Sequence, residues 1–296
     1  MKQLISTVFL TTLILFKMDV QAQSFKTIET DNLKLQVYNA SENSFGVASV
    51  IISGKTDAVL IDAQFTLADA EKVAAEIKNS GKKLTVIYVS HSDPDFYFGL
   101  EVFKKYFPEV TAYASPATVE SIKANAQKKL EVWGERLGKN ITSNVVLPQV
   151  LKGNSIALEG QQLEIIGLEE FPTKTFLWIP SIKAVVGGIN VFGTSFHLWM
   201  ADAQTVEARK QWVAVLDKIE LLKPTIVVPA HAKSETAFDL TAVQHTKSYI
   251  HFYEEALKTN KTSETLIAAL KTKYPTLTFE TALQIGAKVN TGEMKW

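Results

Sequence analysis

An imidazole and two carboxylates alternate directly after an apolar, β-branched run, in the order His91, Asp93 and Asp95. The preceding run, residues 84–89, has the composition of a buried central strand. Because side chains two residues apart can point the same way as a strand ends, these three can converge on one point. Such a set accepts Zn²⁺ and also harder ions such as Mn²⁺ or Fe²⁺. The pattern indicates either a metal loop or a strand-to-helix turn capped by Asp93 or Asp95.

Three further polar residues lie at informative positions. His231 follows the apolar run 225–228, and polar residues at strand ends in such sheets often face the site crevice. Asp62 also ends an apolar run, where we expect a structural carboxylate that accepts N–H bonds from the following turn. His197 lies among aromatic residues, which is typical of a packed histidine. His91 and His231, from two separate strand ends, together favour a functional site.

The elements that position these residues follow from the periodicity of apolar side chains. Strands are predicted at 33–38, 47–52, 58–61, 84–89, 111–114, 155–158, 163–166, 175–179, 184–186 and 225–228. Helices are predicted at 67–77, 98–106, 116 toward 133, 205–222, 235–258 and 263–271. Each half of the chain begins with strands and continues with alternating helices and strands. This order predicts an α/β fold in which two mixed sheets pack together with helices outside.

The first 22 residues are typical of a secretory signal peptide. Lys2 supplies the positive charge, Leu4 to Phe16 form a short apolar run, and Val20 and Ala22 give a small-residue cleavage pattern. An uncleaved anchor or a buried first helix are the alternatives. We therefore expect an exported protein, periplasmic or secreted, with no stable membrane span after cleavage, because no later run is long and apolar enough.

Composition limits the partners. The 31 basic and 31 acidic residues balance to a net charge of zero, which gives no electrostatic reason to expect nucleic acid. There is no cysteine, so a transition metal would need His, Asp or Glu ligands. The length fits one domain over residues 23–296, with helices from about 235 onward as an extension. We expect a small-molecule substrate, and the oligomeric state stays open.

Together these segments resemble the metallo-β-lactamase superfamily. The resemblance begins with the hairpin ending at Asp62 and includes the loop HSDPDFYFG, residues 91–99. It continues through residues 178–188 and ends at His231. The resemblance implies a four-layer αββα sandwich. It also implies a centre that commonly binds two metal ions, usually zinc, and activates water for hydrolysis.

The chain departs from that family at the metal ligands themselves. The family loop H-x-H-x-D-H reads HSDPDF here. The substituted positions are Asp93 and Phe96 for two histidines, Glu169 or Glu170 for a third, and Gly188 for the aspartate that bridges the metals. Phe96 and Gly188 offer no side-chain ligand, so the second metal position loses two of its protein ligands. A conventional binuclear zinc centre is not expected.

Two functions from different classes follow. The first is a hydrolase for an ester, lactone, thioester or related substrate, using water activated by one Zn, Mn or Fe ion. Its ligands would be His91, Asp93 and His231, with Asp95, Glu169 or Glu170 as further candidates, and Asp95 would accept the proton. Its substrate pocket would include Tyr97, His197, Trp199 and Asp202.

The second function is that of a metal-free member, acting as a binding protein or by another mechanism. The persistence of His91, Asp95 and His231 in one chain favours the hydrolase, whereas Phe96 and Gly188 favour the metal-free member.

Overall fold

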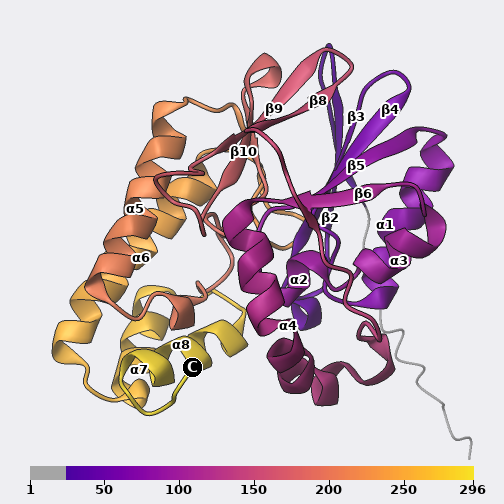
Figure 1. The fold of residues 1–296 in the computed structure, drawn as a ribbon. Helices are drawn as coiled ribbons and strands as arrows, with labels where there is room; N and C mark the ends of the chain where they lie inside the picture. The colour runs from indigo at the N-terminus through magenta and orange to yellow at the C-terminus, as the bar shows by residue number, and fades with distance from the viewer. Residues whose placement is uncertain (1–24) are drawn as a thin grey trace, which may run out of the picture.

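Two mixed β-sheets pack face to face, and helices cover the outer face of each (Figure 1). The computed structural model describes residues 25–296, so the predicted signal peptide lies outside the described residues. The predicted αββα sandwich is confirmed. Within residues 25–296, no helix is long and apolar enough to cross a bilayer.

The larger sheet has seven strands in chain order. Pairing is antiparallel from β1 to β4 and parallel from β4 to β7. The strands are β1 (Lys26–Glu29), β2 (Lys34–Asn39), β3 (Ala48–Ser53), β4 (Asp57–Ile61), β5 (Lys83–Val89), β6 (Thr111–Ala114) and β7 (Gln149–Val150). The parallel half places the carboxyl ends of β4, β5 and β6 at one edge.

The smaller sheet has five strands in the order β12-β11-β10-β9-β8, with β11 and β12 parallel and the other pairs antiparallel. The strands are β8 (Ser155–Leu158), β9 (Gln161–Ile166), β10 (Phe176–Ile179), β11 (Ala184–Val186) and β12 (Ile226–Val227). Because β11 and β12 are parallel, their carboxyl ends also share an edge.

Alternation along the strands divides the apolar side chains between two cores. On β4, Val59 and Ile61 face the smaller sheet, while Leu60 faces the helices. All three are fully buried, and each such side chain stabilises the fold by about 1.5–3 kcal/mol. A continuous apolar run is therefore required in a strand covered on both faces.

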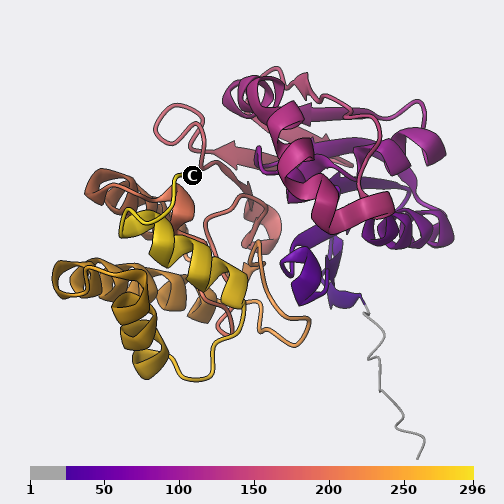
Figure 2. The same ribbon diagram turned by 90° about the horizontal axis from the view of Figure 1, so that it is seen from below.

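Helices occupy both outer layers. The purple α1 and α3 lie beside the larger sheet, whereas the orange α5 and α6 lie beside the smaller one (Figure 1). The yellow α7 and α8 pack beyond the end of α6 (Figure 2). Their bounds are α1 (Leu67–Ser80), α2 (Pro94–Tyr97), α3 (Leu100–Tyr106), α4 (Pro116–Leu137), α5 (Val206–Leu221), α6 (Thr241–Thr259), α7 (Ser263–Lys273) and α8 (Glu280–Asn290).

The predicted elements differ from the observed ones in several places, and the helix α8 was not predicted. The predicted helix 98–106 begins only at Leu100, as α3, and is preceded by the unpredicted helix α2; between them lies Gly99, whose added Cβ would be 1.9 Å from the Ala63 carbonyl oxygen. The predicted helix from 235 begins only at Thr241, because the preceding residues form the loop after His231. The short strands β1 and β7 were missed, since runs of four and two residues carry little periodicity.

Candidate functional site

Four strand ends meet at one edge of the sandwich and carry the polar residues of the candidate site. β4 ends in Asp62, β5 leads into His91, β11 is followed by Gly188, and β12 leads to His231. The hydroxyl of Ser90 ties the two sheets together here, because it accepts a 2.7 Å bond from the Gly188 N–H and donates to Asp62. The two strand ends that carry His91 and His231 therefore lie at one edge of the sandwich.

Backbone contacts on both sides hold His231. Its backbone bridges Val47 on one side and Phe192 on the other. Its Nδ1 lies 3.0 Å from the carbonyl oxygen of Phe45, which can only accept, so Nδ1 carries the proton. The free Nε2 then faces Asp95, whose Oδ2 is 3.6 Å away. Burial lowers the pKa of His231 to about 4, so the ring is neutral at pH 7.

Asp95 is more deeply buried than Asp93. It is 4 % exposed on the short helix α2. Burial raises the pKa of Asp95 well above its usual range, and the negative charge of Asp93 raises it further. Asp95 and His231 therefore form a buried pair of a carboxyl group with a raised pKa and an unprotonated imidazole nitrogen.

His91 and Asp93 form a second pair nearer the solvent. The Nδ1 of His91 accepts a 3.2 Å bond from the Asp93 N–H and lies 3.5 Å from the Asp93 carboxylate. Asp93 is the N-cap residue of α2, yet its side chain makes no cap bond and instead contacts Nζ of Lys129 at 3.1 Å. Despite its burial, the charges of His91 and Lys129 leave the pKa of Asp93 below its usual range.

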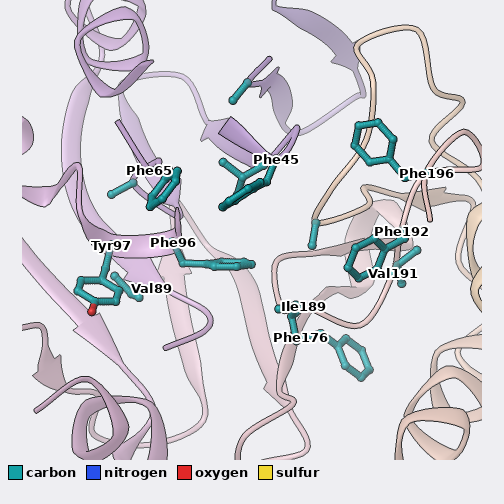
Figure 3. Close-up of a cluster of buried hydrophobic side chains, with 14 of the residues drawn as sticks. Phe45, Phe65, Val89, Phe96, Tyr97, Phe176, Ile189, Val191, Phe192 and Phe196 are labelled. Atoms are coloured by element: carbon teal, nitrogen blue, oxygen red, sulfur yellow. The ribbon is translucent and has the colours of Figure 1, made fainter. Parts of the chain in front are cut away.

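The ring of Phe96 lies against both imidazoles. Its centroid is 5.3 Å from that of His91 and 5.8 Å from that of His231, with edge-to-face geometry in both cases. Figure 3 shows this ring below Phe45, pointing in the opposite direction from the neighbouring Tyr97. An apolar ring therefore occupies the region where the family loop carries its last histidine.

Gly188 cannot be replaced by a ligand without moving the backbone. Its φ is +75°, a region that residues with a side chain rarely adopt. A Cβ at this position would lie 2.3 Å from the carbonyl oxygen of Thr175 on the neighbouring chain segment. The loss of a carboxylate here is thus built into the backbone conformation.

A small aromatic cavity opens beside Asp95 and His231. Its volume is about 30 Å³, and its walls come from segments far apart in the sequence. The lining residues are Phe45, Asp93, Pro94, Asp95, Lys129, Trp133, Ile189, Trp199, His231, Phe279 and Trp296. Five aromatic side chains enclose the carboxyl groups of Asp93 and Asp95 and the imidazole of His231. Such a composition is typical of a small-molecule site.

Comparison with known proteins agrees with this geometry. The model of the metallo-beta-lactamase superfamily matches residues 43–180. Over these residues, somewhat less than half of the chain, the sequence is similar to that superfamily. No curated protein sequence matches it.

Among solved structures, the metallo-beta-lactamase from Pontibacter korlensis is 20 % identical, with a TM-score of 0.54, over 77 % of this chain and 99 % of that one. The metallo-beta-lactamase IND-7 is 18 % identical, with a TM-score of 0.57, over 78 % and 99 %. At such identities these likenesses establish the fold of the superfamily and leave the activity open.

The residues present do not fit the metal centre that the superfamily implies. Within residues 25–296, no three His, Asp or Glu side chains are grouped closely enough to share an ion. Phe96 fills the region beside both imidazoles, Gly188 excludes a side chain, and Lys129 holds the Asp93 carboxylate. The predicted ligands His91, Asp93 and His231 do lie in one region, where the Asp93 N–H is bonded to His91 and His231 lies 3.6 Å from Asp95.

Several residues predicted for the site lie elsewhere. Glu169 and Glu170 are exposed, and Glu170 forms an ion pair with Lys218. Tyr97 is fully buried and packs against Phe98, so it is not part of the cavity wall.

Of the other predicted substrate contacts, His197 lies in the core, whereas Trp199 and Asp202 lie near the cavity. His197 is fully buried and lies 3.0 Å from the Tyr249 hydroxyl, which is the packed arrangement that its aromatic surroundings indicated. Trp199 lines the cavity, and Asp202 accepts a bond from Trp296, which also lines it. The roles of Trp199 and Asp202 in binding stay predictions.

Asp62 has a structural role with a different partner from the expected one. It accepts two 2.7 Å bonds from Ser90, one from the N–H and one from the hydroxyl, rather than bonds from its own following turn. The neighbouring strand end supplies these donors because β4 and β5 are parallel and finish together. Burial raises the pKa of Asp62 to about 7.

Sequence reasoning missed the wall that α4 contributes. Lys129 and Trp133 are four residues apart on that helix and so lie on one face, toward the cavity. This spacing was a readable signal. Phe279 and Trp296 carried none, because they reach the site from the last two segments of the chain.

Proposed function

We propose that the protein is a metal-independent, hydrolase-like enzyme that acts on a small molecule beside Asp95 and His231. The observation that carries the proposal is the 3.6 Å approach of Asp95 Oδ2 to His231 Nε2 at the wall of a buried cavity. Buried ionisable groups cost stability unless they are paired, and such pairs concentrate at functional sites. The ring of Phe96 in the family's metal region supports a mechanism without an ion.

The pair can act as a proton donor and a proton acceptor. Burial raises the pKa of Asp95 well above its usual range, which suits its carboxyl to hold a proton and give it to a carbonyl or leaving-group oxygen. His231 donates Nδ1–H to Phe45, so its Nε2 lone pair is available to take a proton from an attacking water. General acid and base groups of this kind each contribute about 10²–10⁴-fold in rate.

We also propose that the protein is exported, since residues 1–22 have the pattern of a signal peptide. Fractionation of the producing cells and N-terminal sequencing of the purified protein test this. A chain beginning near residue 23 in the periplasm or medium supports export. A cytoplasmic chain that retains Met1 overturns it.

Turnover of a panel of aryl esters, lactones and thioesters, with and without EDTA, tests the enzymatic proposal. We expect hydrolysis that persists in EDTA and falls at least about a hundredfold in Asp95→Asn and in His231→Gln. The matched control is Asp31→Asn, an exposed carboxylate far from the site, which should keep full activity. Activity lost in EDTA and restored by zinc overturns the metal-independent proposal.

A binding function is the second candidate, and the small size of the cavity favours it. A volume of about 30 Å³ holds little more than a water molecule in this conformation. A binding protein would retain ligand affinity in Asp95→Asn and would show no turnover with any member of the panel. Measurable turnover that depends on Asp95 excludes this candidate.

A further inference from the structure

A second, larger hollow lies directly outside the cavity. Its volume is about 460 Å³, and it is formed by the face of α4 that carries Lys128, Lys129 and Val132, together with residues 294–296. Four residues line both spaces, namely Asp93, Lys129, Trp133 and Trp296. The indole of Trp296 therefore stands between the cavity and the outer hollow.

The indole is held by three different kinds of contact. Its Nε1–H donates a 2.6 Å bond to Oδ1 of Asp202. Its ring meets that of Trp199 edge to face, with centroids 5.5 Å apart. The ammonium of Lys129 lies 5.6 Å from its centroid. The side chain nevertheless stays 38 % exposed, so it covers the cavity rather than completing a sealed core.

The groups around the indole would serve equally well for a ligand. Trp199 offers an aromatic edge contact, Lys129 a cation over the ring, and Asp202 an acceptor for one N–H. Each type of contact is weak by itself, so a ligand that reproduces all three can displace a tethered side chain. The same set of groups selects a planar aromatic ring that carries an N–H donor.

The segment that carries Trp296 is anchored just before it. The chain leaves α8 through Gly292, at φ +81°, and Glu293 accepts 2.6 Å bonds from the N–H and hydroxyl of Ser263. The N–H of Met294 donates a further 3.1 Å bond to the Lys288 carbonyl oxygen, so only residues 295–296 lie beyond the last backbone bond to α8. Figure 2 shows the end of the chain rising from the yellow helix α8 toward the space between the two halves of the molecule.

We propose that Lys129, Trp199 and Asp202 form a binding subsite for an indole-like or aryl-amine group, which Trp296 occupies until a ligand displaces it. The class of substrate is thus a small molecule with a planar aromatic N–H group, whose remainder lies at the mouth of the cavity beside Asp95 and His231. The reaction of that remainder rests on the proposed function, whereas binding of the aromatic group does not.

Titration with indole, followed by calorimetry, tests the subsite in the full-length chain, in Trp296→Ala and in a chain ending at Glu293. Occlusion reduces apparent affinity by the fraction of molecules that are open. If about one molecule in ten is open, both variants bind indole about tenfold more tightly than the parent. Leu221→Ala, which removes an exposed apolar side chain far from the site, should bind as the parent does.

The acceptor is tested within the chain ending at Glu293. Asp202→Ala should weaken indole binding about tenfold, and Asp202→Asn should restore most of it because the amide keeps an acceptor oxygen. 1-Methylindole, which lacks the N–H, should bind no better to the shortened chain than to its Asp202→Ala variant. Weaker indole binding after removal of Trp296, or equal affinity for indole and 1-methylindole, overturns the proposal.

These readouts separate the subsite from the enzymatic proposal. Tighter indole binding in the shortened chain, with no turnover of any aryl-amine ester or amide, retains the subsite and overturns the proposed hydrolysis. Turnover that depends on Asp95 but is unchanged by substitution of Trp296 or Asp202 retains the proposed hydrolysis and overturns the subsite.

Discussion

The ring of Phe96 lies edge-on to the imidazole of His231, with their centroids 5.8 Å apart. In the superfamily loop the residue at this position is a histidine that binds metal. Here an apolar ring fills the space, and the imidazole of His231 turns its Nε2 to the Asp95 carboxyl instead. This substitution removes one metal ligand, and in the proposed function it leaves Asp95 and His231 to transfer protons.

Metal binding is the first consequence that can be measured. The purified wild-type protein should contain less than about a tenth of an equivalent of Zn, Mn or Fe, and added Zn²⁺ should leave its thermal midpoint unchanged, because a ligand that binds only the folded state raises stability. In Phe96→His, an imidazole replaces the ring, and Zn²⁺ should then raise the midpoint.

Phe96→Leu is the control, since it opens space without adding a ligand. Its midpoint should not respond to Zn²⁺. One equivalent of tightly held metal in the wild-type protein would contradict the claim that the Phe96 ring prevents metal binding.

The second consequence concerns Gly188. Gly188→Asp places a Cβ 2.3 Å from the Thr175 carbonyl oxygen at a φ of +75°. We expect a loss of about 1–3 kcal/mol from backbone strain alone, measured as the free energy of unfolding in urea. Gly134→Ala is the matched control, because it lies in α4 with open space around it, and it should gain about 0.5–1 kcal/mol. A fully stable Gly188→Asp variant would show that the bridging position is not closed by the backbone.

The convergence of the strand ends was predictable from the sequence, because apolar runs end abruptly in His91, Asp62 and His231. Parallel pairing places such ends together, as it does for β4 and β5. Orientation after the strand was harder to predict. The helical turn of α2 rotates successive side chains by about 100°, so Phe96 enters the site while Tyr97 points away.

The ion pair between Lys129 and Asp93 could not be predicted from the sequence. Lys129 lies 36 positions after Asp93 and reaches it only because α4 runs past the β5 loop. Trp296 is farther still, and nothing in its local sequence marks a contact with Asp202. Long-range contacts between helices and loops leave no periodic pattern, whereas strand burial does.

The third prediction uses the pH dependence of Asp62. Its pKa rises from 3.8 in the unfolded chain to about 7 in the folded one, so the folded state holds a proton that the unfolded state has lost. The stability from this group is complete below about pH 4 and is lost as the pH rises to about 7, at no more than about 1.4 kcal/mol per pH unit.

The unfolding free energy of Asp62→Asn should therefore fall less than that of the wild-type protein across this window. The difference between the two urea-unfolding curves, measured from pH 4 to pH 8, isolates Asp62 from other groups. Asp31→Asn, at an exposed position, should parallel the wild-type protein. A constant difference across the window would contradict a raised pKa.

The fourth prediction tests whether Tyr97 is a core residue, as the structure places it, or a substrate contact, as the sequence predicted. Its side chain is fully buried, and its hydroxyl has no hydrogen-bond partner among the described residues. Removing an unsatisfied buried hydroxyl relieves a desolvation cost of about 1–3 kcal/mol, so Tyr97→Phe should be at least as stable as the wild-type protein, with unchanged ligand binding and turnover. Tyr38→Phe is the contrasting variant: its hydroxyl donates a 2.6 Å bond to the buried Asp69, and its loss should lower the unfolding free energy. A drop in binding or turnover in Tyr97→Phe would return Tyr97 to the substrate pocket and contradict the observed orientation of α2.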